Sequence, residues 1–250
     1  MVEANLNEIL DFREDIKTER KCLMCGRFTL SAEEEEISER FNLTTPIGGY
    51  EKRYNIAPSQ LVLAIINDGR KNRAGYLKWG LVPQWAKDAT IGHKLINARG
   101  ETITEKPSFR QAFRQKRCLI VTNGFYEWKR EGKNKIPMYI TFKDKRLFAF
   151  AGLWETFQTH KSEPLHTCTI ITTTPNDLVR EVHDRMPVIL PKVNEHRWLD
   201  PTFEDVSSLQ NMIKPFPADE MITYQVSSLV NSPRNEGASL LDKDEPTTLF

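Results

Sequence analysis

The sequence predicts an α+β fold in a single domain, with a curved, barrel-like and mainly antiparallel sheet and short helices packed outside it. Apolar runs of strand length recur along most of the chain, and only a few short segments carry helical periodicity. The length of 250 residues suits one domain, and 39% hydrophobic with 28% charged residues is an ordinary globular balance. We expect the folded domain over residues 24–232, an N-terminal extension over 1–23 and a polar tail over 233–250.

Two helices are expected around the first strand. Residues 5–20 place apolar side chains on one helical face. A strand is expected to end at Leu30, and a second helix to follow it, because Ser31 and Glu34 have the spacing of a capping box.

The other elements are predicted from apolar runs and the turns between them. Residues 61–66 and 73–79 are expected to form a hairpin around Asn67-Asp68-Gly69. Further strands are expected at 118–128, 137–142, 147–154, 166–173, 187–190 and 222–227. Three short helices are expected: from Pro107, after Thr174-Pro175 with Thr174 as the cap, and over 203–214.

Composition excludes several classes of protein. The formal charge of +1, from 35 Lys and Arg against 34 Asp and Glu, provides no global field for a nucleic-acid partner. The four cysteines are too few for a disulfide framework, which favours a reducing compartment. No apolar run approaches the roughly 18–20 residues that span a bilayer, and no signal peptide is recognisable. A cytoplasmic protein without membrane contact is therefore expected.

A carboxylate among aromatic residues is the first candidate for chemistry. Strand alternation puts Phe125 and Glu127 on one face and Tyr126 and Trp128 on the other. Partial desolvation would raise the pKa of Glu127 and favour a general-acid role. The alternative is a structural ion pair between Glu127 and an arginine, and the spacing alone does not decide between them.

Two other segments offer polar candidates. His183 lies between a predicted helix and a predicted strand, where a loop can aim an imidazole into a cleft. A single histidine is, however, more often structural. Asn97 and Arg99 share one side of an extended segment and could hold a phosphate or carbonyl oxygen, although a turn and a surface arginine explain them equally well. No histidine pair has metal-ligand spacing, and neither a metal nor a cofactor is expected.

Aromatic and basic residues allow two interpretations each. Trp79 and Trp85 enclose a Gly/Pro turn and could belong to the core or form a stacking platform for bases. Residues 106–117 carry five basic residues and no acidic one. They either follow a phosphate backbone or form a solvated helix face.

Met24 and Cys25 have the form of an initiator methionine before a small residue, yet they stand inside the chain. Cys22 and Cys25 also form a CxxC pair. Zinc is not expected, because there is no second CxxC and no histidine at finger spacing. The residues that follow do not supply the βαβ context of a thioredoxin site.

Seven motifs occur together in one order. They are Met24-Cys25-Gly26-Arg27-Phe28, Tyr54-Asn55-Ile56-Ala57-Pro58-Ser59, Trp79-Gly80-Leu81-Val82-Pro83, Asn97-Ala98-Arg99, Gly124-Phe125-Tyr126-Glu127-Trp128, Ala151-Gly152-Leu153-Trp154 and His183-Asp184-Arg185-Met186-Pro187. Over about residues 24–232 the chain thereby resembles the SRAP family, the abasic-site processing proteins of bacteria and the HMCES-like proteins of animals.

The resemblance implies a β-barrel-like core with outer helices, and a protein that crosslinks covalently to abasic sites in single-stranded DNA. It implies that Met24 is lost and that Cys25 becomes the nucleophile, with Asn97, Glu127 and His183 completing the site. The positions that match residues near the DNA strand are Arg27, Trp79, Arg99, Trp128 and Arg185. We expect a monomer that associates with the nucleoid when bound to damaged DNA.

The chemistry of an abasic sugar explains why the cysteine must be N-terminal. A free α-amine, with a pKa of about 7.7–8, can form a Schiff base with the open-chain aldehyde. The thiol of the same residue can then close onto the imine carbon as a thiazolidine, before β-elimination breaks the strand. We expect Glu127 to orient the amine and relay protons, His183 to act as acid and base on the sugar oxygen, and Asn97 to fix the geometry.

The sequence departs from the family pattern at its start. Because 23 residues precede Met24, Cys25 has no free amine while they remain. We favour translation from Met24; self-cleavage between Met24 and Cys25 and retention of the extension are the alternatives. Two other functions stay open: a cysteine peptidase using Cys25 and His183 with Glu127 or Asn97 as the orienting group, and a non-covalent single-strand binder whose tryptophans stack bases.

Overall fold

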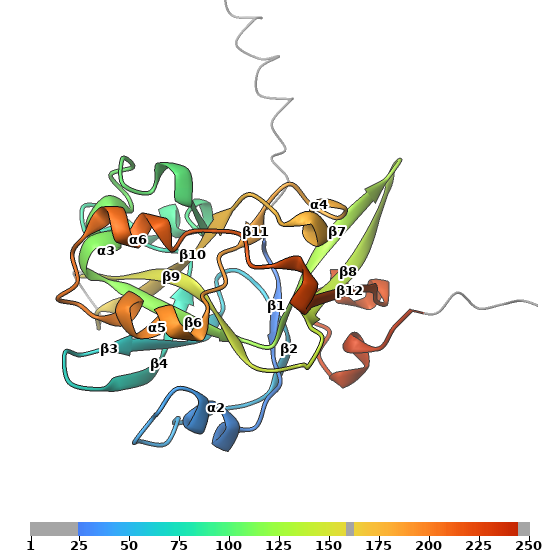
Figure 1. The fold of residues 1–250 in the computed structure, drawn as a ribbon, viewed down its shortest axis with the longest axis horizontal. Coiled ribbons are helices and arrows are strands. Elements are labelled where there is room, and N and C mark those ends of the chain that lie inside the picture. Colours follow the sequence, from blue (N-terminus) through green and yellow to red (C-terminus); the bar gives the residue numbers. More distant parts are fainter. Residues whose placement is uncertain (1–24, 159–162, 245–250) are drawn as a thin grey trace, which may run out of the picture.

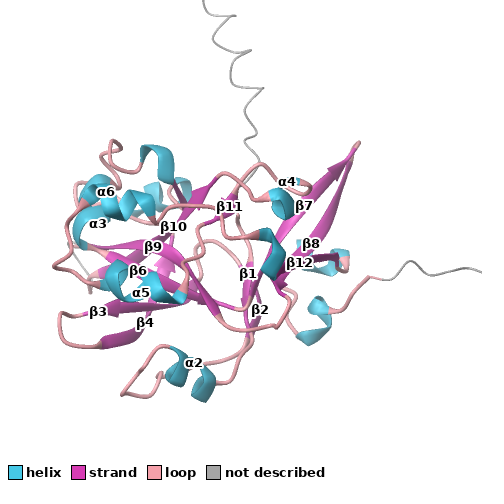
Figure 2. Cartoon of the chain, viewed as in Figure 1, coloured by secondary structure: helices cyan, strands magenta, loops and turns pink. Residues whose placement is uncertain are grey.

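The computed structural model describes residues 25–158 and 163–244, and two β-sheets dominate it (Figure 1). Figure 2 shows that the helices are short and lie around the sheets, so the predicted α+β class is confirmed. The strands are β1 (Phe28–Leu30), β2 (Arg53–Ile56), β3 (Leu61–Asn67), β4 (Asn72–Trp79), β5 (Asn97–Arg99), β6 (Arg117–Thr122), β7 (Gly124–Glu131), β8 (Asn134–Phe142), β9 (Phe148–Phe157), β10 (Leu165–Thr173), β11 (Met186–Pro187) and β12 (Met221–Gln225). The helices are α2 (Glu34–Arg40), α3 (Arg110–Gln115), α4 (Asp177–Arg180), α5 (Lys192–Leu199) and α6 (Val206–Asn211). The 3-10 helices are η1 (Ala89–Lys94), η2 (Gly100–Thr102), η3 (Ala218–Glu220), η4 (Ser228–Asn231) and η5 (Ala238–Leu241).

Five strands close into a barrel in the order β10-β4-β3-β6-β9, because β9 and β10 also pair with each other. The pairing of β10 with β4 is parallel, and the other four pairings are antiparallel. Every residue of β6 is buried. The predicted curved, mainly antiparallel core is therefore confirmed, and so is the β3–β4 hairpin.

A second sheet, in the order β12-β8-β7-β1-β2, packs against this barrel. Phe28 of β1 contacts Trp79 and Phe150 of the barrel, with ring centroids 5.2 and 5.7 Å apart. Phe125 of β7 contacts Phe150 at 5.8 Å. Each such buried ring contributes about 2–3 kcal/mol of hydrophobic stabilisation. The packing holds β1 against the barrel, and Cys25 lies three residues before this strand.

The single strand predicted over 118–128 is wrong, because the chain forms two strands there, β6 in the barrel and β7 in the second sheet. Asn123 stands between them, and its groups bond to segments outside β6 and β7. Its main-chain N–H donates to Thr29 O at 3.2 Å, and its side-chain oxygen accepts from the Thr29 hydroxyl and the Ser31 N–H, both at 3.0 Å. These bonds turn the chain from one sheet into the other.

Two predicted helix caps are also wrong. The Ser31 hydroxyl accepts from the Asn123 amide at 2.8 Å, and the Glu34 carboxylate accepts from the Ile47 N–H at 2.7 Å, so neither caps α2. Asn176 rather than Thr174 caps α4, since its side chain accepts from the Val179 N–H.

Other boundaries differ more modestly. The helix predicted from Pro107 begins at Arg110, the one predicted over 203–214 covers Val206–Asn211, and the strand predicted over 187–190 is only β11. Helix α5 and strand β2 were not predicted. The helix predicted over 5–20 lies outside the described residues. None of the helices within residues 25–158 and 163–244 has the length and apolar character needed to cross a bilayer.

Candidate active site

The site predicted from the motifs lies where the two sheets meet. Cys25 precedes β1, Glu127 lies in β7, Asn97 begins β5, and His183 lies in the loop between α4 and β11. Strands β5 and β11 both pair with the C-terminal part of β10, so the barrel brings Asn97 and the His183 loop to one end of that strand. The Asn97 side-chain amide donates to the Cys25 main-chain oxygen at 3.5 Å.

Strand β7 delivers Glu127 to this point. The strand is held against β1 by the pair Phe28–Phe125 and by a 3.0 Å bond from the Tyr126 N–H to Arg27 O. Phe125 belongs to the main core, whereas Tyr126 and Trp128 pack in a second cluster with Tyr139 and other residues. The predicted alternation along this strand is therefore confirmed.

Glu127 is 1% exposed, and its Oε1 accepts no hydrogen bond from any described residue. Burial raises the pKa of Glu127 to about 7, against the opposing effects of the His183 charge and of hydrogen bonds from Cys25. No ion pair within the described part of the chain joins it to an arginine, as the structural alternative would require. Both protonation states of this carboxyl are therefore accessible near neutral pH.

Cys25 is 4% exposed and has a left-handed φ of 37°, which costs a non-glycine residue conformational energy. Its Sγ donates to Arg185 O at 3.9 Å. Burial and the nearby Glu127 carboxylate raise the pKa of the thiol well above its ordinary value, and the Arg185 charge opposes this. The thiol is therefore neutral, whereas an activated thiolate nucleophile needs the opposite shift.

His183 is 8% exposed, and its ring is fixed by its own loop. The main-chain N–H of Arg185 donates to His183 Nδ1 at 3.1 Å, and Asp184 Oδ1 lies 3.2 Å from the same nitrogen. The main-chain N–H of His183 donates to Val179 O at 2.8 Å, and this bond joins the loop to α4. The imidazole is thus held in one orientation beside the Glu127 carboxyl.

Arg185 is a buried structural cation in this arrangement. Its guanidinium donates to both carboxylate oxygens of Glu101, at 2.6 and 2.9 Å, and to Thr172 O at 2.8 Å. The ion pair holds the pKa of Glu101 below its ordinary value. Since Thr172 lies in β10, Arg185 anchors the His183 loop to the barrel.

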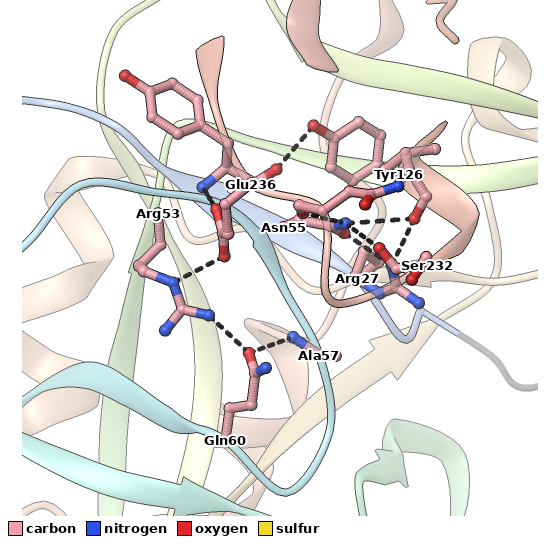
Figure 3. A network of polar contacts seen from close by, with 11 residues as sticks. Arg27, Arg53, Asn55, Ala57, Gln60, Tyr126, Ser232 and Glu236 are labelled. Carbon is pink, nitrogen blue, oxygen red and sulfur yellow. Dashed lines mark hydrogen bonds and ion pairs between the residues drawn. The ribbon is translucent and has the colours of Figure 1, made fainter. Parts of the chain in front are cut away.

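Arg27 and Trp128 both bind the C-terminal part of the chain, and Figure 3 shows the Arg27 side chain beside Asn55 and Ser232. Arg27 Nη1 donates to Asn55 Oδ1 and to Val230 O, both at 2.7 Å. Its guanidinium carbon lies 5.6 Å from the centre of the Trp128 ring, within cation–π range. Trp128 Nε1 donates to Asn231 Oδ1 at 2.7 Å.

Asn55 is a residue of the site region that the motifs contain but to which sequence reasoning gave no role. It is completely buried, and its amide donates to the carbonyls of Val230, Ser232 and Asn235 at 3.3, 2.9 and 2.9 Å. Glu236 extends this network to β2 through the Arg53 guanidinium and the Tyr54 N–H, both at 2.8 Å. The segment over 230–236 is thereby bound to Arg27, directly before β1, and to β2.

Asn55→Ala is expected to lower the free energy of unfolding by about 2–4 kcal/mol, because it leaves buried carbonyls and the Arg27 guanidinium without a partner. Urea unfolding of the full chain measures this. Asn72→Ala is the matched control: the Asn72 amide donates to a single main-chain carbonyl, Phe41 O at 3.0 Å. Equal losses in the two variants would contradict the role given to Asn55.

Trp79 and Arg99, the two other residues predicted to lie near the DNA strand, differ in exposure. Trp79 is 1% exposed, its indole N–H donates to Ile96 O at 2.8 Å, and its ring packs on Phe28. The Trp79 ring therefore offers no face for base stacking. Of the two interpretations of this residue, membership of the core is the one that the structure supports. Arg99, by contrast, is exposed. Trp85, the other tryptophan of the Gly/Pro turn, is 59% exposed.

The basic residues over 106–117 also include both buried and exposed side chains. Arg117 is buried and donates to main-chain carbonyls of Phe113, Arg114, Trp198, Asp200 and Phe203. Lys116 pairs with Glu155. Only Lys106, Arg110 and Arg114 are exposed, so the run is in part a structural anchor.

Within the described ranges, no group of three or more His, Cys, Asp or Glu side chains is arranged to hold a metal ion. The candidate site brings together the Cys25 thiol, the Glu127 carboxyl with a pKa of about 7, the His183 imidazole and the Asn97 amide.

Comparison with known proteins agrees with the motifs. The family model described as SOS response associated peptidase (SRAP) matches residues 24–233. The abasic site processing protein YoqW of Bacillus subtilis is 56% identical over 222 residues, which cover 88% of this chain and 99% of that protein. The abasic site processing protein HMCES of Xenopus tropicalis is 27% identical over 256 residues, covering 85% of this chain and 76% of the other. A crystal structure of a Bacteroides thetaiotaomicron protein superposes with a TM-score of 0.80 at 29% identity, covering 88% of this chain and 99% of that one.

Proposed function

The chain belongs to the SRAP family, and from this premise we propose that it processes abasic sites in single-stranded DNA by forming a covalent crosslink through Cys25. The lesion is proposed because relatives such as YoqW and HMCES are named abasic site processing proteins. The attachment point is proposed from the convergence of Asn97, Glu127 and the His183 loop on one cysteine. The crosslink would shield the lesion during repair.

The proposed reaction joins the sugar aldehyde to both nucleophiles of one residue. The Cys25 amine, freed by loss of Met24, attacks the aldehyde carbon, and the resulting carbinol loses water to give a Schiff base. The thiol sulfur then bonds to the imine carbon while its proton passes to the nitrogen. The product is a five-membered thiazolidine, and one water is released overall.

The single observation that carries the proposal is the buried Glu127 beside Cys25. A carboxyl with a pKa of about 7 can accept a proton from the amine and return it to the leaving hydroxyl at the same pH. The neutral thiol of Cys25 suits this sequence, because it must keep its proton until the imine has formed. His183 is proposed to protonate the ring oxygen as the sugar opens, and Asn97 to hold the Cys25 carbonyl.

The test is a denaturing gel of protein mixed with an abasic oligonucleotide. Protein beginning at Cys25 is expected to give a heat-stable adduct, whereas Cys25→Ala gives none. Cys25→Ser keeps the amine but lacks sulfur, so its adduct should survive only after borohydride reduction. An adduct with Cys25→Ala equal to that of wild type would overturn the proposal, and peptide turnover without DNA would favour the peptidase alternative.

A further inference from the structure

The hairpin of β7 and β8 projects beyond the rest of the fold, as Figure 1 shows at its upper right. Its base holds Glu127 and Trp128, and its distal part from Lys129 to Lys135 carries four basic side chains and one acidic one. The four residues nearest the turn, 131–134, and Arg130 and Lys135 beside them are exposed. The tip is therefore a cationic arm attached directly to the candidate active site.

The two faces of this arm differ in charge. On the face shared with Glu127, the Lys129 ammonium pairs with the Glu131 carboxylate at 2.9 Å. On the other face, Arg130 lies directly opposite Lys135 in the strand register. No hydrogen bond or ion pair of their side chains is present within the described residues. The two charges on the first face form an ion pair with each other, whereas the second face carries two exposed cations with no ion-pair partner among the described residues.

Like charges at opposed positions of an antiparallel pair lower the stability of the sheet. A folded chain gains nothing from Arg130 and Lys135 as neighbours, whereas an anion between them would be bound by both. Along the same face, two residues or about 7 Å nearer the body, lies Trp128 with the Arg27 guanidinium over its ring. The face thus runs from an aromatic ring to a pair of cations, the combination that binds single-stranded nucleic acid.

We infer that Arg130 and Lys135 bind the phosphodiester backbone of the DNA strand that flanks the abasic site. The inference rests on the proposed function, since it continues the path of the strand beyond Trp128. The hairpin acts as a second phosphate-binding site away from the chemistry. It strengthens binding to strands long enough to reach the tip and leaves the reaction at Cys25 unchanged.

The experiment measures equilibrium binding of the full chain to labelled single strands carrying a tetrahydrofuran, an abasic analogue without a carbonyl. The double variant Arg130→Gln/Lys135→Gln is expected to bind a strand of about 15 nucleotides roughly tenfold more weakly at low salt. The slope of log affinity against log salt should fall in magnitude by about 1.4, since each phosphate contact to a single strand contributes about 0.7. The double variant should unfold at the same or a higher urea concentration than wild type.

Lys143→Gln/Lys145→Gln is the matched control, because it removes the same charge from the exposed turn at the other end of β8. It should leave the salt slope unchanged. The inference is overturned if Arg130→Gln/Lys135→Gln keeps the wild-type slope, or if the control lowers the slope equally. Because the analogue has no aldehyde, these outcomes are independent of crosslinking, whose failure would instead overturn the proposed function.

Discussion

Protein that begins at Cys25 is expected to form a heat-stable adduct with an abasic strand at least about a hundredfold faster than protein that retains residues 1–24. In the longer chain the Cys25 nitrogen belongs to a peptide bond, so it cannot form a Schiff base. Adduct formation on denaturing gels, with the intact mass of each protein measured before and after incubation, determines this difference. The mass also reveals whether the chain cleaves itself before Cys25.

The sharpest control adds one residue, alanine, before Cys25. That protein keeps a free amine and a free thiol, but on different residues, so the five-membered ring cannot close. It should give an imine that is trapped only by reduction. A stable adduct from protein whose mass shows the whole 1–24 segment would exclude the thiazolidine.

Glu127→Gln is expected to slow crosslinking by about 10²–10⁴-fold, the usual contribution of a positioned acid or base. In protein beginning at Cys25, the wild-type rate should rise with pH up to about 8, as Glu127 and the α-amine lose their protons. The Glu127→Gln variant should keep only the part of this pH dependence that comes from deprotonation of the α-amine. Glu155→Gln is the matched control, since it removes another buried carboxylate, 7% exposed, that pairs with Lys116 away from Cys25. Equal rates in wild type and Glu127→Gln would remove the role given to Glu127.

The same variant is expected to stabilise the full chain at alkaline pH. The folded pKa of Glu127, about 7, lies above the ordinary 4.5, so the folded state holds its proton where the unfolded state has lost it. Stability therefore falls as pH rises from about 4.5 to about 7, by roughly 3 kcal/mol for this group. Glutamine should remove that decline, which urea unfolding at pH 5 and pH 8 measures. An unchanged pH dependence in the variant would contradict the burial of an ionisable Glu127.

Much of the fold follows from local patterns in the sequence. The β3–β4 hairpin and the alternation in β7 were predictable, because the period of two and the turn residues are local signals. The break between β6 and β7 was not, because Asn123 interrupts the apolar run only through bonds to Thr29 and Ser31. Helix α5 was missed because its sequence is largely polar and its buried Trp198 and Leu199 come at its end.

In the candidate site, too, some features follow from local sequence and others depend on distant parts of the chain. The raised pKa of Glu127 was predictable from its aromatic neighbours in sequence. The burial of Trp79 and the Arg185–Glu101 ion pair depend on strands far apart in the chain, so a single sequence cannot distinguish them from surface residues. Asn55 had no local signal for its role, since the carbonyls that its amide binds lie 175 to 180 residues away.

The bond between Arg27 and Val230 spans 203 positions. During synthesis Arg27 is made well before the segment around Val230, to which its guanidinium binds. The surroundings of Cys25 are therefore completed only after the 203 positions from Arg27 to Val230 have been synthesised. Long-range closure of this kind is intrinsically slow. Ribosome-bound fragments that end before Val230 should thus carry an incomplete site around Cys25. The ability to crosslink DNA should arise only when the segment around Val230 has bound to Arg27.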